Sequence, residues 1–233
     1  MNILLVNAIS GITILIIFLL IMIFDKDSKK KIKQVKFICL SGILVALAFS
    51  LNTTGGFILK TILPYKIFEI KLGSFILVLT SFFCGGLLGF ISGFASDFLG
   101  LLFISEGTPC LFFTLTSILW TILPYYLVLN FSKIYYSKKT IYWYLAIAYA
   151  ITSLIISGSD PFILKILYNL PLPLWSMYLP RIIKFPIDLI VNVFLIISCY
   201  LSLRKTLNLE NQFKRNYFAT DPQSLQYNKI YNN

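Results

Sequence analysis

Uninterrupted apolar segments of about 17 to 25 residues recur along the whole chain, and they constrain the fold more than any other feature. A helix of that length crosses a hydrocarbon core roughly 30 Å thick. Of the 233 residues, 58% are hydrophobic and only 12% are charged, which leaves no room for a sizeable water-soluble core. We therefore expect an all-α membrane protein whose function lies inside a helix bundle or on its short loops.

Seven apolar spans are expected, separated by turn residues and basic segments. Their approximate bounds are 3–24, 37–51, 72–84, 85–103, 110–129, 141–157 and 176–203. Two long loops, 52–71 and 158–174, contain proline and separate spans on one side of the bundle. The segment 204–233 is a polar, basic tail without clear periodicity.

The basic residues concentrate at alternate ends of the spans. Residues 25–36, the loop 131–139 and the tail hold 14 of the 20 Lys and Arg residues. Because cytoplasmic loops are enriched in Lys and Arg, we expect these segments in the cytoplasm and the amino terminus outside. The net charge of +11 then reflects topology and anionic lipid headgroups, and nucleic-acid binding is not expected. Heavy use of Ile, Lys, Asn, Phe and Tyr is typical of AT-rich bacterial genomes, so we expect a multi-pass protein of a bacterial plasma membrane.

Asp97 is a carboxylate deep in a predicted span, and it continues a four-residue spacing set by Gly85, Gly89 and Gly93. A carboxylate in a membrane helix costs about 2.5–3.5 kcal/mol on insertion scales, so it usually pairs with a polar group or lines a watery cavity. Asp97 is therefore a candidate ligand-binding residue, with structural hydrogen bonding as the alternative. The glycines favour close helix packing inside the bundle. For Asp188, in the last span, we favour a structural role.

Several basic residues lie on the external side, against the usual charge pattern. Arg181 and Lys184 are three residues apart and share one helical face near the outer end of the last span. Cations at the mouth of an apolar pocket bind carboxylates, bidentately in the case of arginine. Snorkelling toward lipid headgroups is the alternative. The same reasoning makes Lys60, Lys66 and Lys71 candidates, and we include Lys71 in the expected site.

Aromatic residues and absent motifs narrow the function further. Trp175, beside the outer end of the last span, is placed to stack on a flat ligand ring, whereas most other aromatic residues are expected in membrane-interface belts. The sequence contains no His, no P-loop, no HExxH or GxSxG motif and no clustered acidic metal site. We therefore expect neither an enzyme nor a metal or cofactor site.

Two motifs resemble those of a transport family. Glu69-Ile-Lys-Leu-Gly-Ser-Phe-Ile-Leu-Val-Leu, followed by Cys84-Gly-Gly-Leu-Leu-Gly-Phe-Ile-Ser-Gly-Phe-Ala-Ser-Asp-Phe-Leu-Gly100, resembles helices two and three of a substrate-binding S component of an energy-coupling-factor (ECF) vitamin transporter. Pro180-Arg-Ile-Ile-Lys-Phe-Pro186 resembles the start of the last helix in the folate subgroup. The likeness covers residues 36–203.

The resemblance implies a six-helix substrate-binding bundle over 36–203. One extra transmembrane anchor with a basic linker, 1–35, would precede it, and the basic cytoplasmic tail, 204–233, would follow it. Folate would be captured from outside and handed to a transmembrane T component driven by two ABC-type ATPases. Small residues on the first bundle helix pack against the T component in this family, so the resemblance assigns that face to Gly42, Ala46 and Ser50.

Folate fits the candidate residues chemically. Its glutamate end carries two carboxylates, which suit Arg181 and Lys184. Its pterin edge offers N–H donors, which Asp97 could accept as a pair. Its flat rings suit stacking on an aromatic side chain such as Trp175.

Three other interpretations stay open. The same architecture could bind riboflavin, thiamine or a queuosine precursor, but a neutral or cationic vitamin leaves Arg181 and Lys184 without a function. An intramembrane enzyme would need Asp97 and Asp188 to face one cavity. A scaffold or assembly factor without a ligand would leave the external cations and Asp97 unexplained.

Overall fold

The computed structural model describes residues 3–62, 73–103, 110–134, 140–168 and 173–203. These residues form helices joined by short turns, and no strand occurs among them. The helices are α1 (Ile3–Phe24), α2 (Lys26–Lys31), α3 (Val35–Ile62), α4 (Gly73–Cys84), α5 (Gly86–Phe103), α6 (Leu111–Ile134), α7 (Thr140–Tyr168) and α8 (Leu174–Leu203).

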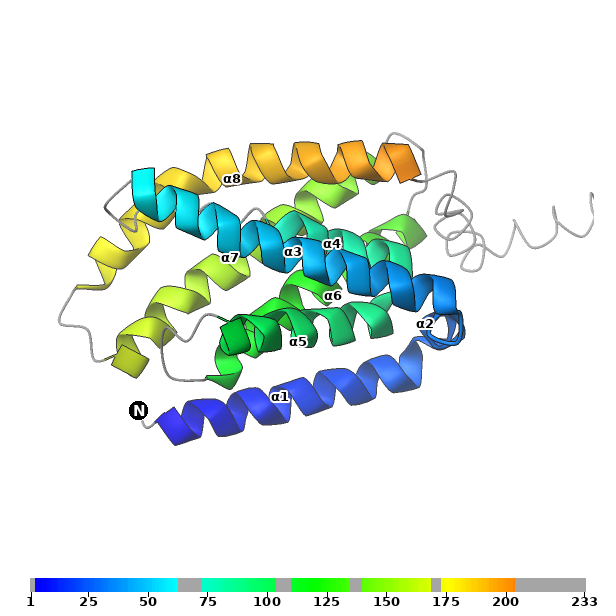
Figure 1. The fold of residues 1–233 in the computed structure, drawn as a ribbon, viewed down its shortest axis with the longest axis horizontal. Helices are drawn as coiled ribbons and strands as arrows, with labels where there is room; N and C mark the ends of the chain where they lie inside the picture. The colour runs from blue at the N-terminus through cyan, green and yellow to red at the C-terminus, as the bar shows by residue number, and fades with distance from the viewer. Residues whose placement is uncertain (1–2, 63–72, 104–109, 135–139, 169–172, 204–233) are drawn as a thin grey trace, which may run out of the picture.

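Six of the described helices, α1, α3, α5, α6, α7 and α8, are long and apolar enough to cross a membrane. They lie side by side: α1, α6 and α8 run in one direction, and α3, α5 and α7 run in the other (Figure 1). Many of their large apolar side chains are exposed, especially on α1 and α8, as lipid contact requires. The expectation of an all-α, multi-pass membrane architecture is confirmed at this level.

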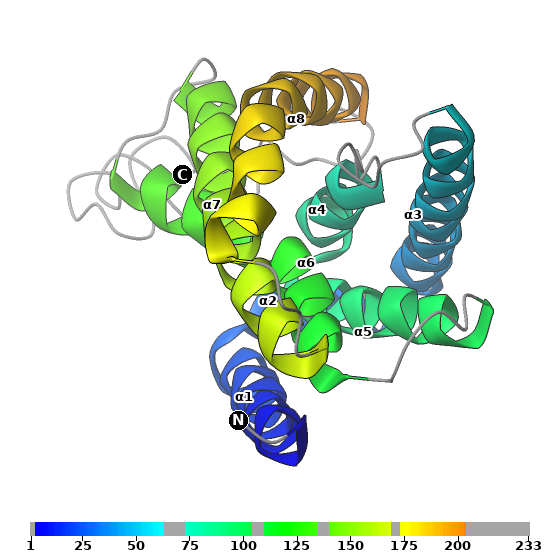
Figure 2. The ribbon, with the colours of Figure 1, turned by 90° about the vertical axis from the view of Figure 1, so that its left-hand side faces the viewer.

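The span expected at 72–84 is the shorter helix α4, whose 12 residues rise about 18 Å. That is less than a hydrocarbon core of about 30 Å, so the described part of α4 does not cross a membrane alone. Every residue of α4 except Phe75 is buried. The helix packs on α3, α5, α6 and α8 and forms the centre of the bundle (Figure 2).

Two expected loops are partly helical. α3 continues to Ile62 instead of ending near residue 51, and α7 continues to Tyr168 instead of ending near residue 157. Proline normally breaks a helix because it lacks the N–H and clashes with the preceding turn. Pro161 nevertheless lies buried inside α7. The apolar sequence continues beyond it, and in lipid the backbone has no water to hydrogen-bond with, so the helix is favoured on both sides of the proline.

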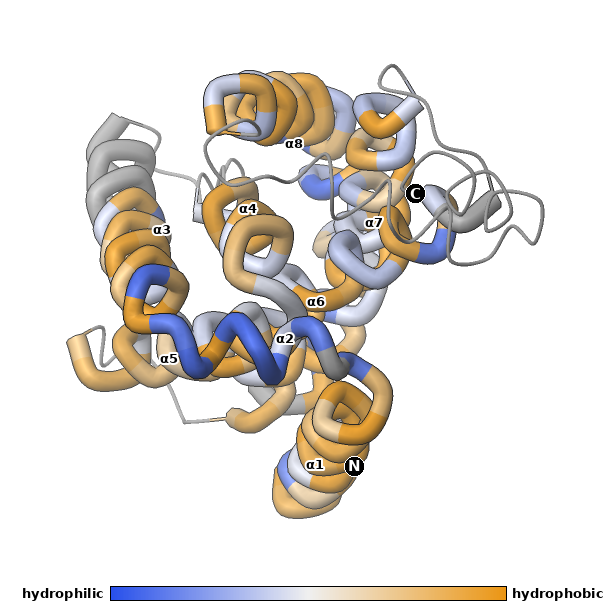
Figure 3. The backbone as a smooth tube through the Cα atoms, turned by 90° about the vertical axis from the view of Figure 1, so that its right-hand side faces the viewer, coloured by the Kyte–Doolittle hydropathy of each residue, from blue (hydrophilic) through white to orange (hydrophobic). Residues whose placement is uncertain are grey.

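The first helix packs on the bundle. Ile21 of α1 is buried in an apolar cluster with residues of α5 and α6, and the Phe18 ring lies 5.4 Å from the Phe90 ring. The Asn7 side chain accepts a hydrogen bond from the Leu111 backbone N–H at 2.9 Å and so caps the start of α6. The lysine-rich α2 then turns the chain at the end of the bundle opposite the amino terminus (Figures 1 and 3).

Candidate functional site

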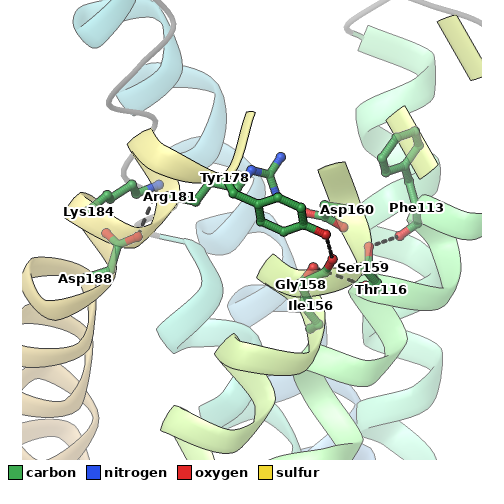
Figure 4. A network of polar contacts seen from close by, with 10 residues as sticks. All are labelled: Phe113, Thr116, Ile156, Gly158, Ser159, Asp160, Tyr178, Arg181, Lys184 and Asp188. Carbon is green, nitrogen blue, oxygen red and sulfur yellow. Dashed lines mark hydrogen bonds and ion pairs between the residues drawn. The ribbon is translucent and has the colours of Figure 1, made fainter. Parts of the chain in front are cut away.

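Two polar contacts join the end of α7 to the start of α8, on the side predicted to be external and called the outer end below (Figure 4). A guanidinium nitrogen of Arg181, Nη1, donates to Oδ2 of Asp160 at 3.2 Å, which also makes an ion pair. The Tyr178 hydroxyl donates to the backbone carbonyl of Gly158 at 2.7 Å. Asp160 and Gly158 can reach α8 because α7 continues helically past residue 157. Without that continuation, the predicted cation Arg181 would have no carboxylate partner on α7.

The second predicted cation is also paired. Lys184 Nζ lies 3.1 Å from Oδ2 of Asp188, one turn further along α8. Both residues are on α8, and they lie beside the α7–α8 contact (Figure 4). Its i, i+4 spacing brings the two side chains together on one helical face. The structural role expected for Asp188 agrees with this pairing.

An open hollow of about 380 Å³ lies at the start of α8, lined by Leu174, Trp175, Tyr178 and Ile182. Its lining is mostly apolar. Tyr178 belongs to the lining and also makes the hydrogen bond to Gly158 described above. Trp175 is 75% exposed, so one indole face is open to an incoming ring. Arg181 and Lys184 are not among the residues that line the hollow, and Lys184, nine residues after Trp175, lies on the opposite face of α8.

Asp97 lies elsewhere, on the face of α5 that meets α6. The Thr114 hydroxyl donates to Asp97 Oδ2 at 2.6 Å. One turn earlier on α5, a Cβ at Gly93 would lie 2.7 Å from the Ile118 Cα and 2.8 Å from the Ser117 carbonyl oxygen of α6. The glycine stripe thus brings two backbones into contact, as expected, and Asp97 continues the same contact with a hydrogen bond.

The predicted site residues fall on both sides of α4. α5, with Asp97, and α8, with Arg181 and Lys184, each pack on α4 from different directions (Figures 2 and 3). Lys66 and Lys71 lie outside the described residues, as does the side chain of Lys60.

The small residues of α3 form an outward-facing stripe. Gly42, Ala46 and Ser50 are all exposed, and a Cβ added at Gly42 would meet nothing within 4 Å. The Ser50 hydroxyl donates to the Ala46 carbonyl of its own helix at 2.8 Å, so this hydroxyl has a hydrogen-bond partner without needing water. The face is therefore shaped for close approach of another helix.

Asp160 was missed as a site residue, and the hydrogen bond from Tyr178 to α7 was not predicted. Asp160 follows Gly158-Ser and precedes Pro161, a pattern typical of a loop. The apolar run after Pro161 was the signal that α7 continues, and a continued helix would have placed Asp160 near the outer end of α8. Tyr178 is one helical turn before Arg181, so the same face of α8 carries both.

Among the described residues, no three His, Cys, Asp or Glu side chains come close enough together to hold a metal ion. The chain matches no protein family, and no curated protein or solved structure shows significant similarity to it.

Proposed function

We propose that this protein is the substrate-binding membrane subunit of an ECF-type vitamin transporter and that it captures folate from outside the cell. The observation that carries the proposal is the start of α8. An apolar hollow with an open indole face is lined there by Tyr178, and a partly exposed arginine, Arg181, follows one helical turn later. A flat ring system attached to a carboxylate matches this combination of apolar hollow, aromatic face and guanidinium.

Folate provides both parts of that ligand. Its rings stack on Trp175 in the hollow, and a carboxylate of its glutamate binds Arg181, with Lys184 one turn away. Asp97 accepts N–H groups of the pterin through the carboxylate oxygen that Thr114 does not use. Binding of this kind needs no catalytic step, and we propose none.

Transport requires partners, because the sequence has no nucleotide-binding P-loop of its own. In the proposed assembly, two ABC-type ATPases drive a transmembrane T component. The exposed small-residue stripe, Gly42, Ala46 and Ser50, packs against that component. Replacing Gly42 by leucine would then prevent copurification with the T component and leave folate binding unchanged.

The test of the ligand compares two probes with one variant. Arg181→Ala should weaken folate binding at least tenfold, as expected for one lost charge-assisted hydrogen bond. It should spare an uncharged pterin that lacks the glutamate. Lys30→Ala, which removes a positive charge at the opposite end of the molecule, is the matched control. Equal losses for folate and the uncharged pterin would contradict the carboxylate assignment, and binding of riboflavin or thiamine in place of folate would reassign the substrate.

A further inference from the structure

The basic helix α2 is fixed to the bundle on one side. Ser28 is 1% exposed, and a Cβ added at Gly85 would lie 2.6 Å from its hydroxyl oxygen. Gly85 has a φ of 93° and lies between α4 and α5, so α2 rests directly on this corner. The Lys31 amine donates to the Phe83 carbonyl at 3.2 Å, at the end of α4. The short helix is therefore a packed element and not a loose linker between α1 and α3.

Lysines are exposed along the rest of this segment. Residues 25–36 contain six lysines and two aspartates. Lys30, Lys33 and Lys36 are exposed. The Lys30 side chain is 78% exposed and lies 3.9 Å from Asp27, an ion pair too open to water to hold the amine in place. Figure 3 shows the segment as a hydrophilic band that crosses this end of the bundle.

Exposed apolar side chains adjoin the lysines in both directions along the chain. Phe24 is 77% exposed and precedes the segment, and Val35 and Ile38 are exposed at the start of α3. In a membrane, lipid chains cover these side chains, because exposing large apolar surface to water is unfavourable. The hydrocarbon core of the bilayer therefore ends beside α2, which puts the lysines at the level of the lipid headgroups.

We propose that the exposed lysines of residues 30–36 bind anionic lipid headgroups, whose phosphate oxygens accept from Lys30, Lys33 and Lys36. Each lysine near an anionic membrane surface strengthens the attraction about fivefold. A lysine amine is a hydrated point charge on a flexible stem, which suits phosphates that diffuse past it, whereas docked protein interfaces favour arginine. Residues 25–36 include no arginine, which favours lipid over an acidic protein as the occupant. The inference goes beyond the proposed function, because it holds whether or not the bundle binds a vitamin.

The experiment compares the lipids beside α2 with those of the bulk bilayer. Phe24→Trp, in the full chain with Trp143→Phe and Trp175→Phe, gives a fluorescent reporter next to the lysines, since the remaining tryptophan, Trp120, is buried. The chain is reconstituted in vesicles of phosphatidylcholine and phosphatidylglycerol in which one lipid at a time carries brominated chains, which quench a neighbouring tryptophan. The ratio of the two quenching efficiencies gives the local enrichment of phosphatidylglycerol, which should be at least about fivefold over bulk.

Two sets of variants separate charge from shape. Replacing Lys30, Lys33 and Lys36 together by glutamine should lower the enrichment to less than about twofold, and replacing all three by arginine should keep it. Lys165→Gln removes a positive charge from the last turn of α7, at the opposite end of the molecule, and should leave the enrichment unchanged. Enrichment that persists in the glutamine variant would overturn the proposal, because other groups would then attract the lipid.

The reporter chain with its native lysines gives a second test, which stands if the glutamine variant does not fold. In about 1 M salt the Debye length falls to about 3 Å, so the enrichment should drop toward the bulk composition. Bulk composition beside the reporter at low salt would overturn the proposal and leave the lysines to an acidic protein partner. None of these outcomes depends on folate binding, so failure of this inference and failure of the proposed function are distinguishable.

Discussion

The Tyr126 hydroxyl on α6 donates a 2.9 Å hydrogen bond to Oδ2 of Asp25, the residue that separates α1 from α2. Asp25 also accepts from the Ser28 backbone N–H at 2.9 Å and from the Ser28 hydroxyl at 2.6 Å, so it caps α2. A Cβ at Gly86 would collide with the Tyr126 hydroxyl. One carboxylate therefore joins the first helix, the basic turn and the α4–α5 corner.

Tyr126→Phe tests whether this contact holds the first helix on the bundle. A hydrogen bond to a charged group is worth about 1.5–3 kcal/mol, so the variant should unfold at a lower temperature. It should also be cleaved faster by trypsin at the α2 lysines. Tyr178→Phe, which removes a hydroxyl at the other end of the molecule, should leave that cleavage unchanged. Unaltered melting and cleavage in Tyr126→Phe would show that α1 is held by its apolar contacts alone.

Glycines on α3 and α5 should respond differently to the same substitution. Gly93→Ala forces a methyl group against the α6 backbone and should destabilise the protein by about 1–3 kcal/mol. Gly42→Ala adds its methyl group in open space and should be neutral or slightly stabilising, because alanine favours helix. Thermal unfolding in detergent measures both. Equal melting temperatures would mean that α5 and α6 are not in backbone contact.

Asp97→Asn separates ligand binding from folding. The amide oxygen can still accept from Thr114, so the melting temperature should change little. The pterin donors lose a charged acceptor, and folate binding should weaken at least tenfold. Thr114→Val is the converse variant, since it keeps the carboxylate and removes the hydrogen bond, at a cost of about 1 kcal/mol in stability. Wild-type folate affinity in Asp97→Asn would leave Asp97 with a packing role only.

The two exposed tryptophans offer a way to locate the ligand. Trp175 lines the hollow at the outer end of α8, and Trp143 is 70% exposed near the opposite end of the bundle, at the start of α7. Folate should quench fluorescence mainly through Trp175. Trp175→Phe should therefore lose most of the response, and Trp143→Phe should keep it. The reverse result would place the ligand at the other end of the molecule.

Much of the architecture could be predicted from apolar length alone. Spans such as 3–24 and 85–103 are visible because lipid demands continuous apolar helices, and the glycine spacing before Asp97 correctly indicated close packing. The α4 helix could not be distinguished from a full span, because a helix buried by other helices is as apolar as one in contact with lipid.

The candidate site was less predictable than the spans. Arg181 and Lys184 were identified because cations on the predicted external side are unusual, but their ion pairs with Asp160 and Asp188 were not predicted. Asp160 lies in a segment whose Gly and Pro are typical of loops, and only the packing of α7 beyond Pro161 brings it to Arg181. Local signals of helix termination were outweighed by tertiary contacts and by the lipid environment.

Titration of the purified wild-type protein with folate, followed by intrinsic tryptophan fluorescence, tests the central claim most directly. Riboflavin and thiamine, at the same concentrations, are the controls. The proposed function predicts saturable quenching by folate with a sub-micromolar dissociation constant and no response to the other two vitamins. A folded protein that responds to none of the three would contradict the claim that this bundle captures a vitamin.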